Sequence, residues 1–97
     1  MTSYRYLPAA REDLNKAAVF YEASVPGLGD AFLDDVECAI DDIRENPRIG
    51  APIGRAFRRA VLRRSPFTIV YAERDDEIVI VAVAHDRRRP EYWRGRQ

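Results

Sequence analysis

The residues in this sequence with the clearest capacity for chemistry are its arginines. Fifteen of the sixteen basic residues are arginine, and five of these fall within ten positions: Arg55, Arg58, Arg59, Arg63 and Arg64. A guanidinium group is planar and donates two parallel hydrogen bonds to a phosphate or a carboxylate. In an extended strand these arginines would alternate with apolar side chains on both faces. This stretch favours a surface that meets an anionic partner.

Charge is divided unevenly along the chain. Residues 1–47 hold ten acidic and four basic residues, a net charge of −6, and the rest of the chain carries +6. Two explanations fit this division equally well. The basic half either binds an anionic partner or neutralises the acidic half within one fold.

A second group of candidate residues lies toward the C-terminus. His85 is the only histidine. It could act as a general acid or base near neutral pH, but a lone histidine at a strand end more often has a structural role. Tyr92 and Trp93 could stack on nucleic acid bases or hold the basic tail on the sheet. We favour packing for Trp93 and leave both roles open for Tyr92.

No metal-ligand cluster or nucleotide-binding motif is present in the sequence, so we expect no metal site and no cofactor. Cys38 is the single cysteine, which excludes an internal disulfide. It falls among acidic residues of a predicted helix, and we therefore expect the thiol to be at least partly accessible or covered only by a partner. The alternative is burial against Val19, Phe20 or Ala23 of the preceding helix.

Length and composition limit the class of protein. A chain of 97 residues, with 46% hydrophobic and 33% charged residues, is typical of one globular domain, which we assign to residues 1–97. The longest apolar run, Ile78–Ala84, has seven residues, too few to span a membrane. The N-terminus lacks the apolar core of a signal peptide, and we therefore expect a cytoplasmic protein.

Two helices are predicted after a short strand at residues 3–7. Between residues 9 and 25 the apolar residues recur at helical spacing, and Pro26-Gly27 then interrupts the pattern. A second helix is predicted from residue 28 to residue 45, where Asn46-Pro47 ends it. Because the break is short, the two helices should form an antiparallel hairpin.

The apolar period changes to two in the second half of the chain. Residues 47–56 contain two prolines and two glycines and are predicted to be a loop. Strands are predicted at residues 57–64, 67–73 and 77–85, with a hairpin turn at 74–76. The fold class is therefore α+β: an N-terminal strand and a helical hairpin packed on a mostly antiparallel sheet of three to four strands.

The order of these elements and two stretches of sequence resemble the RelE/ParE toxin superfamily of bacterial type II toxin–antitoxin modules. The stretches are PGLGDAFLDDVECAIDDIRENPRIG and FRRAVLRRSPFTIVYAERDDEIVIVAVAHDRRRPEYWRGR, and the similarity covers nearly the whole chain. The resemblance implies a growth-arresting toxin of a plasmid-stabilisation module. It also implies a cognate antitoxin that wraps around the toxin.

The superfamily has two branches with different targets. ParE-like members poison DNA gyrase, and the ending His85-Asp86-Arg87 resembles this branch, which we favour. RelE-like members cleave mRNA in the ribosome. On that alternative, Arg59, Arg63, His85 and Tyr92 are the candidate catalytic residues, because they offer phosphate-binding cations and an acid–base pair. A third possibility is a protein of this fold that only binds a partner.

Two sets of contact residues are expected from this resemblance and from the residue types. An acidic, hydrophobic antitoxin segment suits the stretch in which arginines alternate with apolar residues, and the antitoxin-binding candidates are Arg58, Arg59, Arg63 and Arg64. The target, either gyrase or the ribosome with its mRNA, should meet the basic and aromatic tail. The candidates there are Arg87, Arg88, Arg89, Tyr92 and Trp93, with Arg94 and Arg96 nearby.

Overall fold

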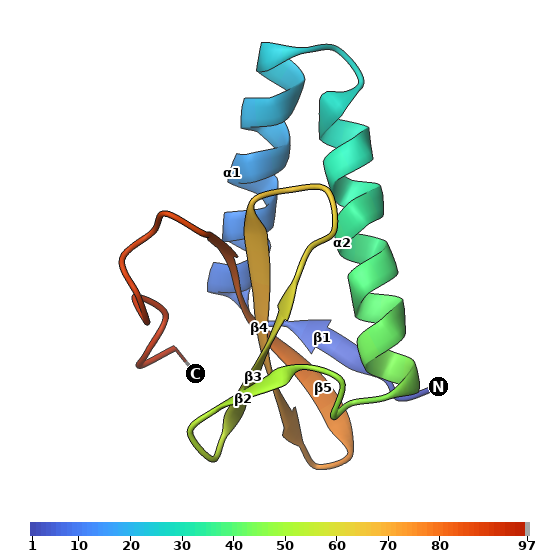
Figure 1. The fold of residues 1–97 in the computed structure, drawn as a ribbon, viewed down its shortest axis with the longest axis vertical. Coiled ribbons are helices and arrows are strands. Elements are labelled where there is room, and N and C mark those ends of the chain that lie inside the picture. The colour runs from blue at the N-terminus through green and yellow to red at the C-terminus, as the bar shows by residue number, and fades with distance from the viewer. Residues whose placement is uncertain (97) are drawn as a thin grey trace.

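The computed structural model describes residues 1–96, which form two helices and five strands (Figure 1). In chain order these are β1 (Tyr4–Tyr6), α1 (Pro8–Ser24), α2 (Leu28–Glu45), β2 (Ala51–Ile53), β3 (Phe57–Val61), β4 (Phe67–Arg74) and β5 (Glu77–His85). The predicted α+β class, with an N-terminal strand and a helical hairpin on a mostly antiparallel sheet, is confirmed.

The sheet has the strand order β1-β5-β4-β3-β2, and all neighbours are antiparallel except β1 and β5, which are parallel. It therefore has one strand more than the expected maximum of four. The additional strand is β2, which forms inside the predicted loop and pairs Ala51 with Arg59 and Ile53 with Phe57. Three residues are too few to show a period of two, and Pro52 is tolerated because β2 lies at the sheet edge.

Strand β3 is shorter than the sequence pattern predicts. It ends at Val61 instead of Arg64. The Leu62 N–H donates to the Phe67 carbonyl at 3.0 Å, which closes the turn between β3 and β4. Arg63 therefore lies in this turn, where its side chain no longer follows the alternation of a strand.

Both helices pack on one face of the sheet, and the core lies between these two layers (Figure 1). Leu14 of α1 and Val36 and Ile40 of α2 are buried there against β4 and β5. Strand β5 is buried on both faces from Ile78 to Val83, as its unbroken apolar run predicts. Within residues 1–96, neither helix is long and apolar enough to cross a bilayer.

Hydrogen bonds and a close helix approach join the two helices near the tip of the hairpin. The Glu22 carboxylate accepts hydrogen bonds from the backbone N–H groups of Gly27 at 3.0 Å and Gly29 at 3.1 Å, which satisfies the first turn of α2. A Cβ at Gly29 would lie 2.8 Å from the Ala18 carbonyl oxygen, so only glycine permits this approach of the helices. The hairpin extends well past the sheet (Figure 1).

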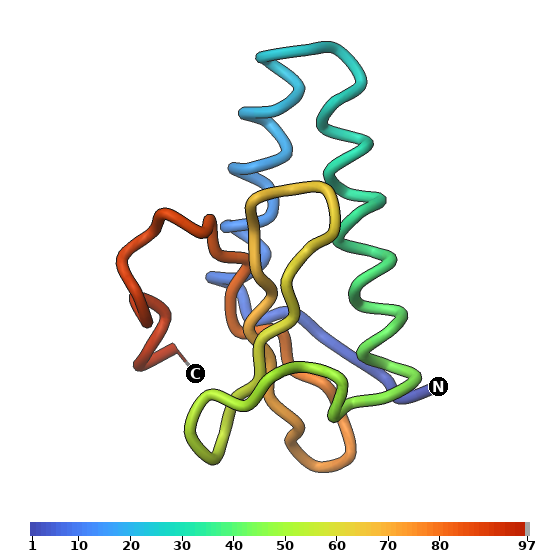
Figure 2. The backbone as a smooth tube through the Cα atoms, viewed as in Figure 1, coloured from blue at the N-terminus to red at the C-terminus, as the bar shows by residue number. Residues whose placement is uncertain are grey.

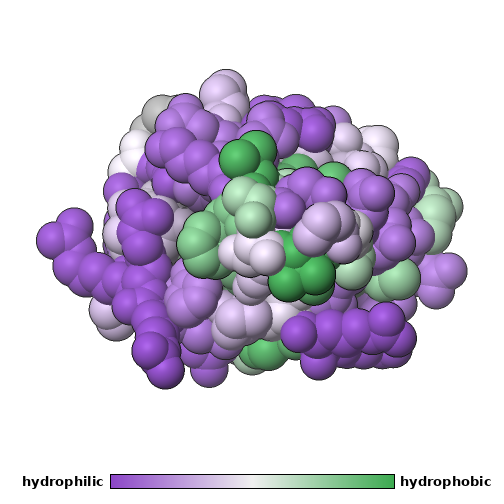
Figure 3. All heavy atoms as spheres, turned by 90° about the horizontal axis from the view of Figure 1, so that it is seen from above, coloured by the Kyte–Doolittle hydropathy of each residue, from purple (hydrophilic) through white to green (hydrophobic). Residues whose placement is uncertain are grey.

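Apolar side chains are exposed on the part of the hairpin that extends past the sheet. Val19, Phe20, Val25 and Leu28 are exposed there, and apolar atoms gather near the centre when the molecule is viewed from this end (Figure 3). Cys38 is exposed as well, so it is not buried against Val19 or Phe20. The expectation of an accessible thiol is confirmed.

Candidate functional site

A groove between α2 and β3, here named the α2–β3 groove, is the first candidate site. It has a volume of about 270 Å³. One wall carries Cys38 and Asp42 of α2, and the other carries Arg59 and Val61 of β3 and Arg63 of the following turn. Ile49 and Val61 expose 53% and 67% of their surfaces, large fractions for apolar residues. The groove therefore combines accessible apolar surface with cations along one wall.

Two of the four predicted antitoxin-binding arginines line this groove and two do not. Arg59 and Arg63 line it. The Arg58 guanidinium lies on the opposite face of β3 and donates to the Gly50 carbonyl at 2.8 Å. Arg64 donates its backbone N–H to Asp35 at 3.1 Å. The expected arginine surface is therefore divided, because alternate strand residues point to opposite faces and the strand ends at Val61.

Asp35 is the buried acidic residue of α2. Its carboxylate accepts hydrogen bonds from the Ser65 hydroxyl at 2.8 Å and from the Arg64 N–H. These bonds attach the β3–β4 turn to α2 and set the width of the groove at this end. Asp35 therefore has a structural role, although the sequence places it on an acidic helix face with Cys38.

An exposed ion pair connects the two walls of the groove. Arg63 lies 3.5 Å from Asp42, with 84% and 47% of the two side chains exposed. A pair this exposed contributes about 0–1 kcal/mol. Arg63 is therefore free to exchange Asp42 for a carboxylate of a partner.

The loop that precedes β2 is held by Tyr71. Its hydroxyl donates to the Pro47 carbonyl at 2.7 Å and accepts from the Gly50 N–H at 2.9 Å. Burial raises the pKa of the Tyr71 phenol, which keeps the hydroxyl protonated as a donor. This contact positions Ile49 at the end of the groove.

A second cavity, of about 260 Å³, lies under the C-terminal segment, which we define as residues 86–96. The segment leaves β5, turns outward and returns beside the sheet (Figure 2). Of the four candidate catalytic residues, Arg59, His85 and Tyr92 line this cavity, whereas Arg63 lines the α2–β3 groove and not this cavity. The structure therefore brings three of the four together.

Contacts already engage the candidates around this cavity. The His85 ring packs edge-on against Phe67, and its Nδ1 accepts from the Arg87 N–H at 3.0 Å. Trp93 is buried against the Phe57 ring, with centroids 4.8 Å apart, so the expectation that it packs is confirmed. Trp93 is thus covered by its own chain, whereas the expected target contacts Arg87, Arg88 and Arg89 are exposed.

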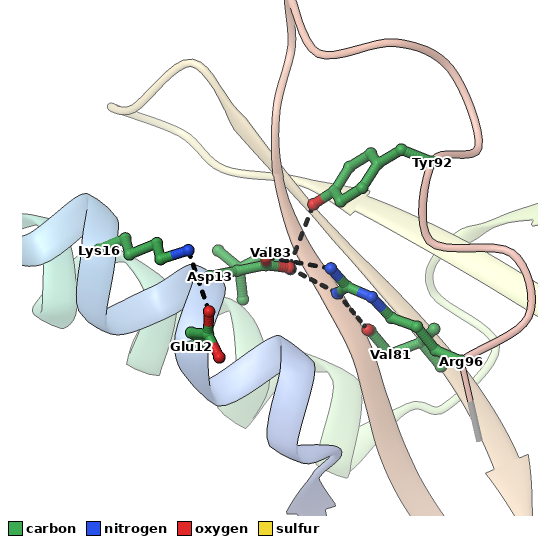
Figure 4. Close-up of polar contacts among 7 residues, drawn as sticks. All are labelled: Glu12, Asp13, Lys16, Val81, Val83, Tyr92 and Arg96. Atoms are coloured by element: carbon green, nitrogen blue, oxygen red, sulfur yellow. Dashed lines mark hydrogen bonds and ion pairs between the residues drawn. The ribbon is translucent and has the colours of Figure 1, made fainter.

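Tyr92 belongs to a polar cluster with Asp13 of α1 and Arg96 (Figure 4). Asp13 Oδ2 accepts from the Tyr92 hydroxyl at 3.1 Å and from Arg96 Nη1 at 2.7 Å, and Oδ1 accepts from Arg96 Nη2 at 3.2 Å. Burial, and then the Asp13 charge, raises the pKa of the Tyr92 phenol to about 12. The hydrogen bond from Arg96 to Asp13 raises the pKa of the guanidinium.

The same two charged groups also bond to the backbone of β5. Asp13 accepts from the Val83 N–H at 3.1 Å, and Arg96 donates to the Val81 carbonyl at 3.0 Å. Only 12% of the Asp13 side chain and 19% of the Arg96 side chain are exposed. No sequence motif marks this cluster. Its one local signal is that Asp13 lies three residues after Ala10 and four before Ala17 on the buried stripe of α1.

Residues 1–96 contain no group of three or more histidine, cysteine, aspartate or glutamate side chains placed to hold a metal ion. The residues in and around the two candidate sites are arginines, apolar side chains and the acids Asp13 and Asp35, which accept hydrogen bonds from the backbone.

The combination of fold and sequence defines the class of protein. Residues 4–90 match the model of the ParE toxin family of type II toxin–antitoxin systems (parDE). Because the match covers most of the chain, the protein belongs to this family. It is therefore a toxin-family member of the RelE/ParE superfamily.

Two solved structures are similar to this chain. One is of the chromosomal ParDE system from P. aeruginosa, with a TM-score of 0.76 and 21% identity over 88% of this chain and 96% of that chain. The other is of the RelBE2 toxin–antitoxin complex from Mycobacterium tuberculosis, with a TM-score of 0.60 and 27% identity over 87% and 96%. Comparison with curated protein sequences finds no match.

Proposed function

We propose that this protein arrests growth by poisoning DNA gyrase and that a cognate antitoxin, encoded in the same plasmid-stabilisation or chromosomal module, neutralises it. The family match supports the assignment to ParE-like toxins. The similar structures come from toxin–antitoxin systems, which supports an antitoxin partner.

The α2–β3 groove is the observation that carries the proposed antitoxin contact. Ile49 and Val61 offer apolar surface, and Arg59 and Arg63 offer two guanidinium groups along one wall. An amphipathic segment that carries carboxylates would bury its apolar side chains on the first pair and bind the second pair. The Arg58 guanidinium would support this surface through the loop that it holds instead of binding the antitoxin. Arg64 holds the β3–β4 turn by its backbone N–H, and its exposed side chain, next to Arg63, stays a candidate contact.

Gyrase poisoning is favoured over mRNA cleavage by the environment of the candidate catalytic residues. A phenol that donates to Asp13 and has a pKa of about 12 is a poor general base near neutral pH. Arg63, the second proposed phosphate-binding cation, lies outside the cavity that holds His85 and Tyr92. A gyrase poison needs no such constellation, because it acts by binding.

Induction of the protein in cells tests the proposal. We expect gyrase–DNA cleavage complexes to accumulate first, and co-expression of the adjacent antitoxin gene to prevent both their accumulation and growth arrest. Codon-phased mRNA cuts without cleavage complexes would instead identify a ribosome-dependent ribonuclease. Normal growth at high expression without the antitoxin, from a protein that still binds the antitoxin when purified, would identify a partner-binding protein without toxicity.

A further inference from the structure

We propose that Asp13 is a positioning residue for the C-terminal segment: through Tyr92 and Arg96 it holds the arginines of this segment in the place from which they contact the target. This inference rests on the proposed function, because a target contact has meaning only for an active toxin. The target surface would be anionic, since the positioned groups are guanidiniums.

The C-terminal segment depends on side-chain contacts for its position. Residues 86–96 contain neither a helix nor a strand. The Asp86 N–H donates to the Pro66 carbonyl at 2.9 Å where the segment leaves β5, but the later backbone hydrogen bonds, such as those from Arg94 to Glu91 and from Arg96 to Trp93, span only a few residues. Trp93 attaches the segment to Phe57 of β3. Asp13 attaches it to α1, so the two contacts fasten the segment to different elements of the fold.

The Asp13 contact reaches the exposed arginines through Tyr92. The Arg88 guanidinium lies 4.0 Å from the centre of the Tyr92 ring, and the Arg96 guanidinium lies 5.0 Å from it. A cation at this distance from an aromatic ring is attracted by it. By accepting from the Tyr92 hydroxyl, Asp13 therefore fixes the ring on which Arg88 lies.

Asp13 holds these groups more firmly than an exposed carboxylate would. Its carboxylate accepts hydrogen bonds from three residues outside α1: Val83 of β5, Tyr92 and Arg96. Charge-assisted hydrogen bonds of this kind are stronger than neutral ones, and they are screened little when they are shielded from water. Among residues 1–96, the adjacent Glu12 makes only the exposed pair with Lys16 at 3.0 Å (Figure 4).

The comparison of Asp13→Asn with Glu12→Gln tests the inference. Both changes remove one carboxylate from neighbouring positions of α1, but only the first affects the segment. We expect trypsin to cleave Asp13→Asn after Arg87 and Arg88 at least tenfold faster than the wild type, as followed by mass spectrometry of the full chain. The Tyr92 phenol pKa should fall from about 12 toward 10 in an absorbance titration referenced to Tyr92→Phe. Glu12→Gln should behave like the wild type in both measurements.

The functional consequence is measured in cells and with the antitoxin. Asp13→Asn should lose at least tenfold in growth arrest, scored as surviving colonies, while its affinity for the antitoxin stays within twofold of the wild type. Arg96→Gln, which leaves α1 and the core unchanged, should reproduce the result, so a folding defect of Asp13→Asn would not obscure it.

Three outcomes overturn the inference. If Asp13→Asn and Arg96→Gln are cleaved at the wild-type rate and Asp13→Asn keeps the Tyr92 pKa, Asp13 does not position the segment. If the segment is released but growth arrest is undiminished, its position does not serve the target contact. If the wild type itself fails to arrest growth, the proposed function fails and the target contact fails with it, whatever the trypsin result.

Discussion

The Asp13 carboxylate of α1 and the Arg96 guanidinium form a two-bond ion pair across 83 positions of sequence, and the pair covers an open edge of β5. Strand β1 pairs with β5 only as far as Ile80, and β5 continues to His85. A shift in the β4–β5 register leaves Val81 without a partner residue in β4, since Val70 faces Ala82 and Tyr71 faces Ile80. The backbone groups of Val81 and Val83 bond to the ion pair, as they would to a neighbouring strand.

The Tyr92 contact in this cluster predicts how stability depends on alkaline pH. Because the phenol pKa is about 12 in the folded chain and near 10 when unfolded, the folded state retains the proton over this range. This contribution is fully present below pH 10 and is lost as the pH rises through 12. Tyr6, whose pKa burial also raises to about 12, acts in the same direction.

Urea unfolding between pH 8 and pH 12 measures this dependence. The urea midpoint of the wild type should fall above pH 10, and the decline should be smaller in Tyr92→Phe. A wild-type midpoint that stays constant up to pH 12, or a decline unchanged in Tyr92→Phe, would contradict the assigned environment of this phenol.

The Tyr71 hydroxyl predicts a stability effect at the α2–β3 groove. Tyr71→Phe leaves the Pro47 carbonyl and the Gly50 N–H without their partner, so we expect a loss of about 1–3 kcal/mol in the free energy of unfolding. Tyr21→Phe is the control, since the Tyr21 ring packs against Phe32 and should lose about 0.5 kcal/mol or less. Equal effects of the two changes would count against the role of Tyr71.

Arg59 and Arg63 should contribute to antitoxin affinity. Arg59→Glu and Arg63→Glu each reverse a charge in the groove, and we expect each to weaken binding at least tenfold, about 1.4 kcal/mol. Arg55→Glu makes the same change at an exposed position between β2 and β3, outside the groove, and should have an effect within threefold. Calorimetric titration at low and high salt should show that the wild-type affinity falls with salt, because these contacts are ionic. A salt-independent affinity would exclude the arginine role.

Cys38 reports occupancy of the same groove. Its exposed thiol should react rapidly with a disulfide reagent in the free protein and at least tenfold more slowly in the antitoxin complex. Cys38→Ser gives the unlabelled baseline and should change the free energy of unfolding by about 1 kcal/mol or less. Rapid labelling in both states would place the antitoxin away from the α2–β3 groove.

The sequence predicts those parts of the fold whose pattern extends over several turns or residues. The apolar stripe of α2 and the unbroken run in β5 each repeat often enough to determine the element and its burial. Strand β2 is not predictable in this way, because it has three residues, includes Pro52 and exists through its pairing with β3. The end of β3 likewise depends on the bond between Leu62 and Phe67, which no local pattern shows.

The candidate sites are only partly predictable for a related reason. Residue type predicts arginines as candidate binding groups, but the direction of each guanidinium depends on strand register, which separates Arg58 from Arg59. The contact of Asp13 with Arg96 joins distant parts of the chain, and its one local signal is a carboxylate on the buried stripe of α1. A charged residue at such a position generally has a buried partner, which the fold must supply.

A cleavage assay with purified DNA gyrase tests the proposed function most directly. Supercoiled plasmid is incubated with gyrase, ATP and the purified protein, and the enzyme is then denatured and digested to release broken DNA. We predict linear plasmid whose amount rises with the protein and disappears when the antitoxin is added first. No linear plasmid at any protein concentration, together with cleavage of mRNA on translating ribosomes, would contradict the proposal.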